Sequence, residues 1–336
     1  MENKSKLFED KLCDTVYLGG GTPSVLSGNQ LKSIIEALHR YFHIYENAEI
    51  TMEMNPCDMT ESYLKNALVQ GVNRISVGVQ TNRDELLVKI GRRHTAAEAE
   101  KAVNRAFKLG FRNISIDLMC ELPGQTVDDF EKTLKYAVHL PVTHMSVYSL
   151  ILEEGTRFSQ MASRGILARP SENDSWAMYQ AMCRILPHYG FERYEISSFA
   201  RTGFQSAHNR KYWKLEDYLG LGPSACSRIG YERWENISNL RLYEERLAAD
   251  EPVEEKNSLS PKEEMEEFAF LGLRMKEGIN GREFYQRYGK EIMEVYGSVV
   301  KKLVKEKMIF LNNGNIQMTY KGAALGNYVF EQFLLD

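Results

Sequence analysis

The residues best suited to hold a polar ligand follow the apolar run Thr15–Leu18, in the sequence Gly19-Gly-Gly-Thr-Pro-Ser24. Glycine lacks a Cβ, so backbone N–H and C=O groups at such a turn can approach a ligand closely. Further short apolar runs end in, or carry near their ends, Glu53, Gln80 and Asp117. If these runs are strands of one barrel, their carboxyl ends converge on one mouth, where barrel enzymes bind ligands. Each residue alone is also compatible with a purely structural role, in a tight turn or as a helix cap.

A second cluster of unusual residues lies in Ala207-His-Asn-Arg-Lys-Tyr-Trp-Lys214. The His208 imidazole can ligate iron, Tyr212 and Trp213 can pack on a porphyrin face, and the basic residues between them can pair with propionates. The residues alone leave two alternatives open. One is a partly buried histidine beside an aromatic core, and the other is a short contact to single-stranded nucleic acid.

Five β-branched runs must position the first cluster, and amphipathic stretches with helical spacing alternate with them. The predicted strands are Thr15–Leu18, Ile50–Glu53, Arg74–Val79, Asn113–Met119 and His144–Leu150, and the predicted helices are Gln30–Phe42, Glu61–Gln70 and Ala96–Leu109. Polar residues 58–60 can cap the second helix, and Gly110 can end the third. This βαβ rhythm predicts an α/β fold built as an open or partial (β/α) barrel.

The C-terminal part has a different pattern. An acidic, loop-like stretch, Asp250–Lys256, precedes Ser260-Pro, which is a typical helix start, and helices are expected near Met265–Met275, Gly281–Gly289 and Met293–Lys307. Asn312-Asn-Gly-Asn315 then predicts a hairpin. We therefore expect three parts: a barrel over 1–190, an irregular connecting region over 191–250, and a winged-helix-like α+β domain over 251–336.

Composition limits the function classes. The net charge of −4 gives no electrostatic reason to expect nucleic acid or an anionic membrane as a partner. The charged start and the lack of a long apolar run predict a cytoplasmic protein without a transmembrane segment. The five cysteines, Cys13, Cys57, Cys120, Cys183 and Cys226, are widely separated and are expected to be reduced thiols.

Taken in order, five motifs resemble the radical-SAM, oxygen-independent coproporphyrinogen-III-oxidase-like family over nearly the whole chain. They are Gly19–Ser24, Glu53-Met-Asn-Pro56, Arg74-Ile-Ser-Val-Gly-Val-Gln80, Gly91-Arg-Arg-His94 and Leu122-Pro-Gly-Gln-Thr126. The resemblance implies a radical-SAM-type barrel in which S-adenosylmethionine is contacted by Gly20, Gly21, Thr22, Glu53, Gln80, Arg92 and Asp117. For Arg92 and the two residues that follow it, a solvated basic turn is the alternative.

The segment His208-Asn-Arg-Lys-Tyr-Trp213 is an HNxxYW motif that resembles the heme-chaperone branch of this family. The resemblance implies heme contacts by His208, Asn209, Tyr212 and Trp213, with His208 as the candidate ligand of the heme iron. Two residues depart from the family pattern. Cys226 stands where histidine is often expected, as a second soft ligand or a small core residue, and Glu121 replaces a usual glycine, where its carboxylate would narrow or recharge the cavity mouth.

The family is also expected to carry a CxxxCxxC loop that holds a [4Fe-4S] cluster, and this sequence has no such spacing. Met1–Cys13 resembles the tail of the family's first helix, so we expect the first strand and cluster loop to be missing upstream, by truncation more than by natural loss. Cys13 alone cannot anchor a cluster that needs several thiolates.

The expected function is therefore that of a heme-chaperone-like protein, which binds heme and an unknown acceptor protein but performs no catalysis in this chain. The alternative is a radical-SAM coproporphyrinogen III oxidase-type enzyme of porphyrin biosynthesis, if the cluster loop is restored upstream. The assembly state, a homodimer included, is left open by the sequence.

Overall fold

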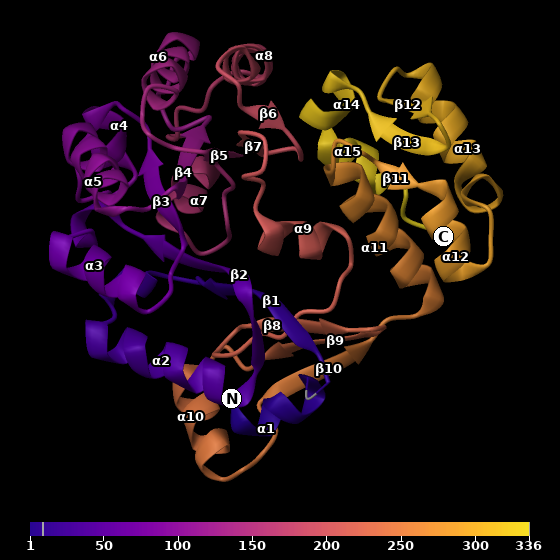
Figure 1. The fold of residues 1–336 in the computed structure, drawn as a ribbon. Helices are drawn as coiled ribbons and strands as arrows, with labels where there is room; N and C mark the ends of the chain where they lie inside the picture. The colour runs from indigo at the N-terminus through magenta and orange to yellow at the C-terminus, as the bar shows by residue number, and fades with distance from the viewer. Residues whose placement is uncertain (9, 336) are drawn as a thin grey trace. The chain divides into compact units, whose positions relative to one another are not determined.

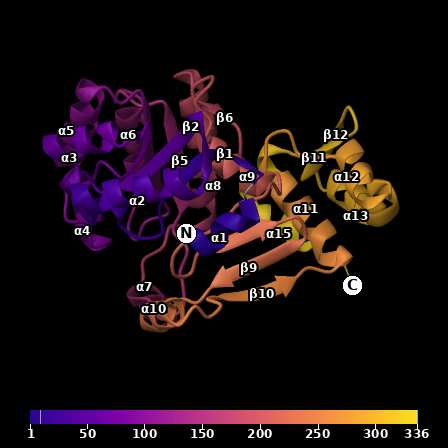
Figure 2. The same cartoon turned by 60° about the horizontal axis from the view of Figure 1, so that its bottom comes forward.

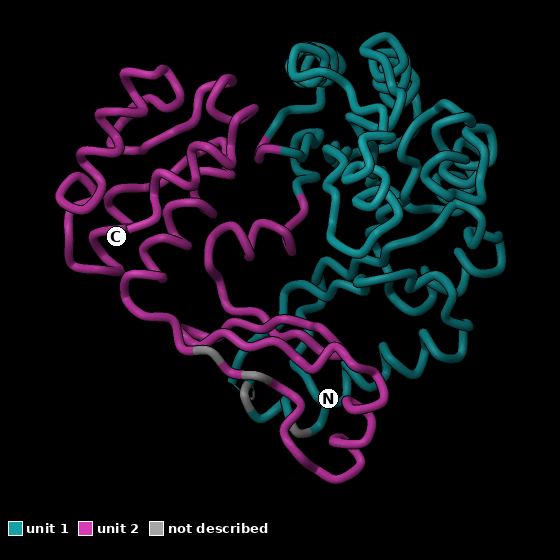
Figure 3. The backbone as a smooth tube through the Cα atoms, turned by 180° about the vertical axis from the view of Figure 1, so that it is seen from behind, with its two compact units in different colours: residues 1–193, 197–205 teal, residues 194–196, 206–336 magenta. Residues whose placement is uncertain are grey.

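A computed structural model describes residues 1–8 and 10–335 and divides the chain into two compact units (Figure 3). Unit 1 comprises Met1–Arg193 and Ser197–Gln205, and unit 2 comprises Tyr194–Ile196 and the residues from Ser206 onward. The chain therefore enters unit 2 for three residues, returns to complete the sheet of unit 1, and then leaves it. The three-part division expected from the sequence stays a prediction.

Unit 1 is built on a seven-stranded sheet with the strand order β1-β2-β3-β4-β5-β7-β6 (Figure 1). Neighbours from β1 to β5 are parallel, whereas β7 and β6 are added antiparallel. The strands are β1 Leu12–Leu18, β2 His43–Met54, β3 Arg74–Gln80, β4 Asn113–Cys120, β5 His144–Ser149, β6 Glu192–Arg193 and β7 Ser198–Ala200. Since β1 and β6 stand at opposite ends, the sheet is open, and the predicted partial barrel is confirmed.

Helices follow most strands of unit 1, and α2, α3 and α5 line one face of its sheet (Figure 1, Figure 2). Their bounds are α1 Glu2–Ser5, α2 Gly28–Tyr41, α3 Glu61–Val69, α4 Asp84–Lys89, α5 Ala96–Leu109, α6 Val127–Ala137, α7 Arg157–Ser163 and α8 Glu172–His188. Local sequence starts and stops them: Thr60 caps α3, and Gly110 ends α5 with a φ of 120°. Among the described residues, no helix is both long and apolar enough to cross a lipid bilayer.

The sheet of unit 1 has one polar and one apolar face. Every second residue of a strand points to the same side, so on β3 Arg74, Ser76, Gly78 and Gln80 share one face. The alternating isoleucine and valine residues of β3 are fully buried on the other face. Parallel strands buried on both faces are usually apolar throughout, so this pattern marks the polar face as a surface that holds something other than helices.

The strand register aligns polar residues across neighbouring strands of this face. Glu53 on β2 pairs with Ser76 on β3, Gly78 pairs with Asp117 on β4, and Asp117 pairs with Ser146 on β5. The register therefore places Glu53 and Ser76 in one row and Gly78, Asp117 and Ser146 in the next, so that four strands contribute to one polar surface.

The N-terminal segment differs in part from the prediction of a helix tail over Met1–Cys13. A short helix does occupy Glu2–Ser5, but β1 begins at Leu12 and includes Cys13, which pairs with Ile44 of β2. The predicted strand began three residues later because Leu12, Cys13 and Asp14 show no regular alternation of apolar residues.

The C-terminal part of unit 2 has the predicted order of helices followed by a hairpin. Helices α11 Pro261–Arg274, α12 Gly281–Tyr288 and α13 Ile292–Lys305 precede β12 Ile309–Asn312 and β13 Asn315–Met318. A short strand, β11 Ile279–Asn280, pairs with β13 to give the sheet order β11-β13-β12. Helices α14 Tyr320–Ala324 and α15 Gly326–Glu331 follow. This arrangement agrees with a winged-helix-like domain.

The prediction of a loop over Asp250–Lys256 and of an irregular region before it is wrong in part. Glu254–Ser258 is strand β10, which pairs antiparallel with β9 Glu232–Asn236, and β9 pairs with β8 Cys226–Ile229. The region also contains helices α9 Ala207–Trp213 and α10 Leu240–Ala248. The residues of β10 are all polar, so the sequence has no apolar alternation to reveal a strand that forms through its partner.

A buried ion pair joins the sheet of strands β8, β9 and β10 in unit 2 to helix α11. The Arg228 Nη2 on β8 donates to both carboxylate oxygens of Glu264 on α11, at 2.7 and 2.8 Å. The side chains are 3% and 1% exposed, and the Arg228 Nη1 also donates to Glu267 at 3.0 Å. A charge this deeply buried depends on its partner.

Replacing Arg228 by methionine should lower the free energy of unfolding by about 3–5 kcal/mol, because Glu264 is left as a buried carboxylate without its cation. Urea denaturation measures the loss. The matched control is Arg241→Met, which breaks an exposed pair with Glu245, the two side chains being 86% and 56% exposed. It should cost less than about 1 kcal/mol. Equal losses in the two variants would show that burial of the pair is not what matters.

Candidate functional site

A cavity of about 110 Å³ opens on the polar face of the unit 1 sheet. Its lining residues come from the glycine turn, from the ends of β2, β3 and β4, and from the segment after α4; they are Gly21, Thr22, Pro23, Glu53, Met54, Asn55, Ser76, Gly78, Gln80, Arg92 and Asp117. The structure thus brings together all residues predicted for the S-adenosylmethionine pocket except Gly20, which lies in the turn beside Gly21.

The glycine turn needs glycine for two different reasons. Gly20 and Gly21 have φ angles of 80° and 154°, which side chains with a Cβ rarely adopt. A Cβ on Gly19 would instead lie 2.6 Å from Cε1 of Tyr17 and 3.0 Å from Oε1 of Glu53. The first glycine therefore serves close packing, whereas the next two serve the backbone path into Thr22.

Asp117 is a partly buried carboxylate of the cavity. The Ser76 hydroxyl donates to its two carboxylate oxygens at 3.3 and 3.2 Å. Burial, and then the nearby carboxylate of Glu53, raise the pKa of Asp117 to about 6, against the opposing effects of Arg74 and of hydrogen bonds from Ser146 and Ser76. Asp117 therefore gains or loses its charge near neutral pH, where that charge can respond to a ligand.

Gln80 ends β3 in a backbone conformation that non-glycine residues avoid. Its φ is 68°, its side chain is buried, and the pairing of β3 with β4 is irregular between Gly78 and Gln80. A Cβ on Gly78 would lie 2.9 Å from Nε2 of Gln80. Gly78 thus makes room for the amide at the cavity, and such strain is typical of positions that hold a functional group in place.

Arg92 reaches the cavity from the segment between α4 and α5. Its Nη1 donates to Oδ1 of Asn55 at 3.2 Å, and burial lowers the pKa of its guanidinium. The next two residues behave differently: Arg93 is 72% exposed and pairs with Asp58, whereas the His94 ring is buried against the carbonyl of Val79. A solvated basic turn therefore describes Arg93 but does not describe Arg92.

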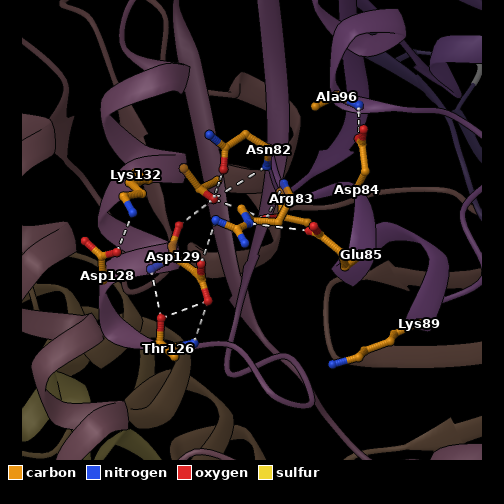
Figure 4. A network of polar contacts seen from close by, with 12 residues as sticks. Asn82, Arg83, Asp84, Glu85, Lys89, Ala96, Thr126, Asp128, Asp129 and Lys132 are labelled. Atoms are coloured by element: carbon orange, nitrogen blue, oxygen red, sulfur yellow. Dashed lines mark hydrogen bonds and ion pairs between the residues drawn. The ribbon is translucent and has the colours of Figure 1, made fainter.

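The segment that carries Arg92 is fixed by a polar network between the loop that joins β3 to α4, the start of α4, and α6 (Figure 4). Thr133 of α6 donates to Oδ1 of Asn82 at 2.8 Å, and Arg83 pairs with Asp129 at 3.1 Å. At the other end of the segment, Asp84 accepts a hydrogen bond from the backbone N–H of Ala96 at 2.8 Å. Helix α4 is absent from the predicted elements, since its six residues are too few to show a clear period.

Several residues of the site were missed by the sequence interpretation. Asn55 holds Arg92, and its own N–H donates to Oγ of Ser24 at 3.1 Å. The Ser24 hydroxyl in turn donates to Asp58 at 2.7 Å. Asn55 and Ser24 belong to the motifs already quoted, Glu53–Pro56 and Gly19–Ser24, so motif membership was the signal that could have identified them.

The charges of the cavity suit a ligand that carries a positive charge. Two carboxylates, Glu53 and Asp117, face one guanidinium, Arg92. Carboxylates also accept hydrogen bonds from hydroxyl groups, and an arginine can form a bidentate pair with a ligand carboxylate. A small zwitterion with a hydroxyl-rich part therefore matches the donor and acceptor set.

The second predicted cluster lies on α9 of unit 2. Ser206 caps this helix by accepting from the N–H of Asn209. The Nε2 of His208 lies 2.7 Å from the Tyr212 hydroxyl, one helical turn away, and the two rings meet edge to face. All four predicted heme residues are therefore on one short helix and are partly exposed.

The two aromatic residues of α9, Tyr212 and Trp213, have surroundings that differ from those of His208 and Asn209. Tyr212 and Trp213 line a cavity of about 250 Å³ together with Leu215, Tyr218, Arg228, Arg233, Glu267, Phe270 and Leu271. His208 and Asn209 are not part of this lining. The guanidinium of Arg274 lies 4.2 Å from the ring of Trp213, and burial raises the pKa of Tyr212 to about 12. Trp213 is thus held in place as part of the packing of unit 2.

The two departures from the family pattern have local partners. Glu121 has a φ of 60°, which explains why glycine suits this position, and its carboxylate accepts from Ser149 and pairs with Arg169 at 3.8 Å. It is not among the residues that line the 110 Å³ cavity, and the expectation that it narrows or recharges the cavity mouth stays a prediction. Cys226, on β8, is partly exposed and lies near Tyr212.

The described residues do not fit a [4Fe-4S] cluster. Over residues 1–8 and 10–335, no three side chains of histidine, cysteine, aspartate or glutamate are grouped so that they could hold a metal ion.

Comparison with known proteins agrees with this geometry. The radical SAM superfamily model matches residues 1–137, and the HemN C-terminal domain model matches residues 259–325. The heme chaperone HemW of Lactococcus lactis is 39% identical over 98% of this chain and 86% of its own length, and that of Bacillus subtilis is 37% identical over 95% and 85%.

The structure of coproporphyrinogen III oxidase (HemN) from Escherichia coli, described as a radical SAM enzyme, superimposes with a TM-score of 0.83 at 21% identity. The match covers 99% of this chain and 84% of HemN, and it shows that the fold is shared. The chain therefore belongs to the radical SAM superfamily, among the HemW-type relatives of oxygen-independent coproporphyrinogen III oxidase.

Proposed function

We propose that this protein binds heme and passes it to an acceptor protein in the cytoplasm, and that the cavity of unit 1 binds S-adenosylmethionine. The observation that carries the heme proposal is a partly exposed imidazole, His208, on a helix that also presents two aromatic rings. The similarity to proteins named heme chaperones, over nearly the whole chain, supports the same function.

The donor chemistry of α9 fits heme. An imidazole nitrogen is a common ligand of heme iron, and the rings of Tyr212 and Trp213 can pack against a porphyrin. The adjacent cavity, at about 250 Å³, is smaller than the roughly 300–1,000 Å³ that drug-sized ligands occupy. A porphyrin would therefore lie on the surface of α9 and would not enter this cavity as a whole.

The contact between His208 and Tyr212 constrains how the imidazole can bind iron. The Nε2 of His208 already has the Tyr212 hydroxyl at 2.7 Å, so ligation through this nitrogen must displace the hydroxyl. Tyr212 thus competes with iron for Nε2 while its ring offers a packing surface.

The polar groups of the unit 1 cavity match those of S-adenosylmethionine, of which a volume of about 110 Å³ would enclose only a part. Glu53 and Asp117 can hold the ammonium group or the ribose hydroxyls, Arg92 can bind the carboxylate, and the backbone groups of the glycine turn are open to close approach. In a radical SAM protein this cofactor supplies radical chemistry together with a cluster, whereas the residues of this chain supply binding and orientation.

Replacing His208 by alanine should weaken hemin binding at least about tenfold and abolish the Soret shift of the bound form, because the iron loses its protein nitrogen. A titration of purified protein with hemin, followed by absorbance, measures both. Tyr212→Phe keeps the ring and removes the competing hydroxyl, so it should bind hemin at least as tightly as the wild type.

The matched control for this titration is His39→Ala, which removes an exposed histidine at the end of α2. It should leave hemin binding unchanged. If His208→Ala and His39→Ala show the same Soret shift and affinity as the wild type, the assignment of His208 as the iron ligand is wrong.

The affinity for S-adenosylmethionine should rise with pH up to about 6 and level off above it, because the pKa of Asp117 is raised to about 6. Below that pH the protonated carboxyl offers no charge to a cationic ligand, and affinity should fall by up to about tenfold per pH unit. Calorimetric titration from pH 5 to 8 tests this. Asp117→Asn should bind weakly with no step near pH 6, whereas Asp128→Asn, on the surface of α6, should behave as the wild type.

A further inference from the structure

Tyr17 contacts the cavity of unit 1 through a residue that lines it. The Tyr17 hydroxyl on β1 donates to Oε1 of Glu53 on the neighbouring strand β2, at 2.8 Å. Glu53 is part of the cavity lining, whereas Tyr17 is not. The hydrogen bond between Tyr17 and the cavity lining therefore runs through the Glu53 carboxylate.

Gly19 lies against this contact, where a side chain would not fit. The register pairs Leu18 with Met52, so Gly19 follows directly beside Glu53. A Cβ at position 19 would lie 2.6 Å from the Tyr17 ring and 3.0 Å from the Glu53 oxygen that accepts the hydrogen bond. Since Gly20 and Gly21 have positive φ angles and Gly19 is absent from that set, the need for glycine at position 19 is one of space. Glycine at position 19 thus leaves the space that the Tyr17 and Glu53 side chains occupy.

Tyr17 holds Glu53 without cancelling its charge. Burial, and then the carboxylates of Glu53 and Asp117, raise the pKa of Tyr17 far above its usual range, so the phenol keeps its proton. A neutral donor restrains one oxygen and leaves the negative charge and the remaining acceptor sites of Glu53 for a ligand. A lysine or arginine in the same place would neutralise the carboxylate and weaken its attraction for a cation.

We propose that Tyr17 is a positioning residue that fixes the Glu53 carboxylate for the bound S-adenosylmethionine, and that Gly19 exists to admit it. This inference rests on the proposed pocket in unit 1. It adds a residue outside the cavity lining and outside the motif that begins at Gly19. It also assigns the first glycine of the turn to a side-chain pair, and not to the ligand itself.

Calorimetric titration with S-adenosylmethionine tests the proposal on five proteins besides the wild type. Tyr17→Phe removes the hydroxyl and should weaken binding about tenfold, the effect of losing one hydrogen bond to a charged group. Gly19→Ala crowds the pair while keeping both side chains and should weaken binding similarly. Tyr45→Phe, at an exposed tyrosine of β2, is the matched control and should leave affinity unchanged. Thermal unfolding reports whether each variant is folded.

The fourth protein is Glu53→Ala, and the fifth is the double variant that carries Glu53→Ala and Tyr17→Phe. If Tyr17 acts through Glu53, the second substitution should change the affinity of Glu53→Ala less than about twofold, whereas a general packing role would weaken both backgrounds equally. Equal weakening, or wild-type affinity in Tyr17→Phe, overturns the inference and leaves the pocket intact. Failure of the wild type to bind S-adenosylmethionine overturns the pocket assignment and the inference with it.

Discussion

The constraint on which the site in unit 1 depends is the alternation of polar and apolar residues along its parallel strands. Helices bury the apolar face, so the polar residues must either satisfy one another or serve a ligand. They do the first in the pairs Tyr17–Glu53, Ser76–Asp117 and Ser115–His144. Where the strands end, this network opens into the cavity.

The same constraint explains the strained positions around the cavity. Gln80 takes a left-handed backbone conformation, and its amide lies against Gly78, which leaves the space for it. Arg92 enters from outside the sheet, and its segment needs a network of its own to α6. Binding groups are thus held by several independent contacts, which is how a small polar site keeps its geometry without its ligand.

The sequence predicted the sheet and the cavity well because both follow short-range patterns. Strand alternation, helix caps such as Thr60, and the glycine turn each need only a few consecutive residues. What it missed depends on partners far along the chain. Strand β10 is recognised by its pairing with β9, and Asn55 by its hydrogen bond to Arg92. The role of Tyr17 is recognised because a Cβ on Gly19 would collide with its ring. Motif spacing placed His208 and Tyr212 together, but their 2.7 Å contact required the structure.

Heme binding by a histidine of α9 is the central functional claim, and the identity of the iron ligand tests it most directly. Electron paramagnetic resonance of the ferric-heme complex, prepared with ¹⁵N-labelled histidine, detects a ligating imidazole through its nitrogen hyperfine coupling. The account predicts ¹⁵N coupling that is present in the wild type and absent in His208→Ala. A complex whose spectrum shows no histidine nitrogen at the iron, or the same coupling without His208, would contradict it.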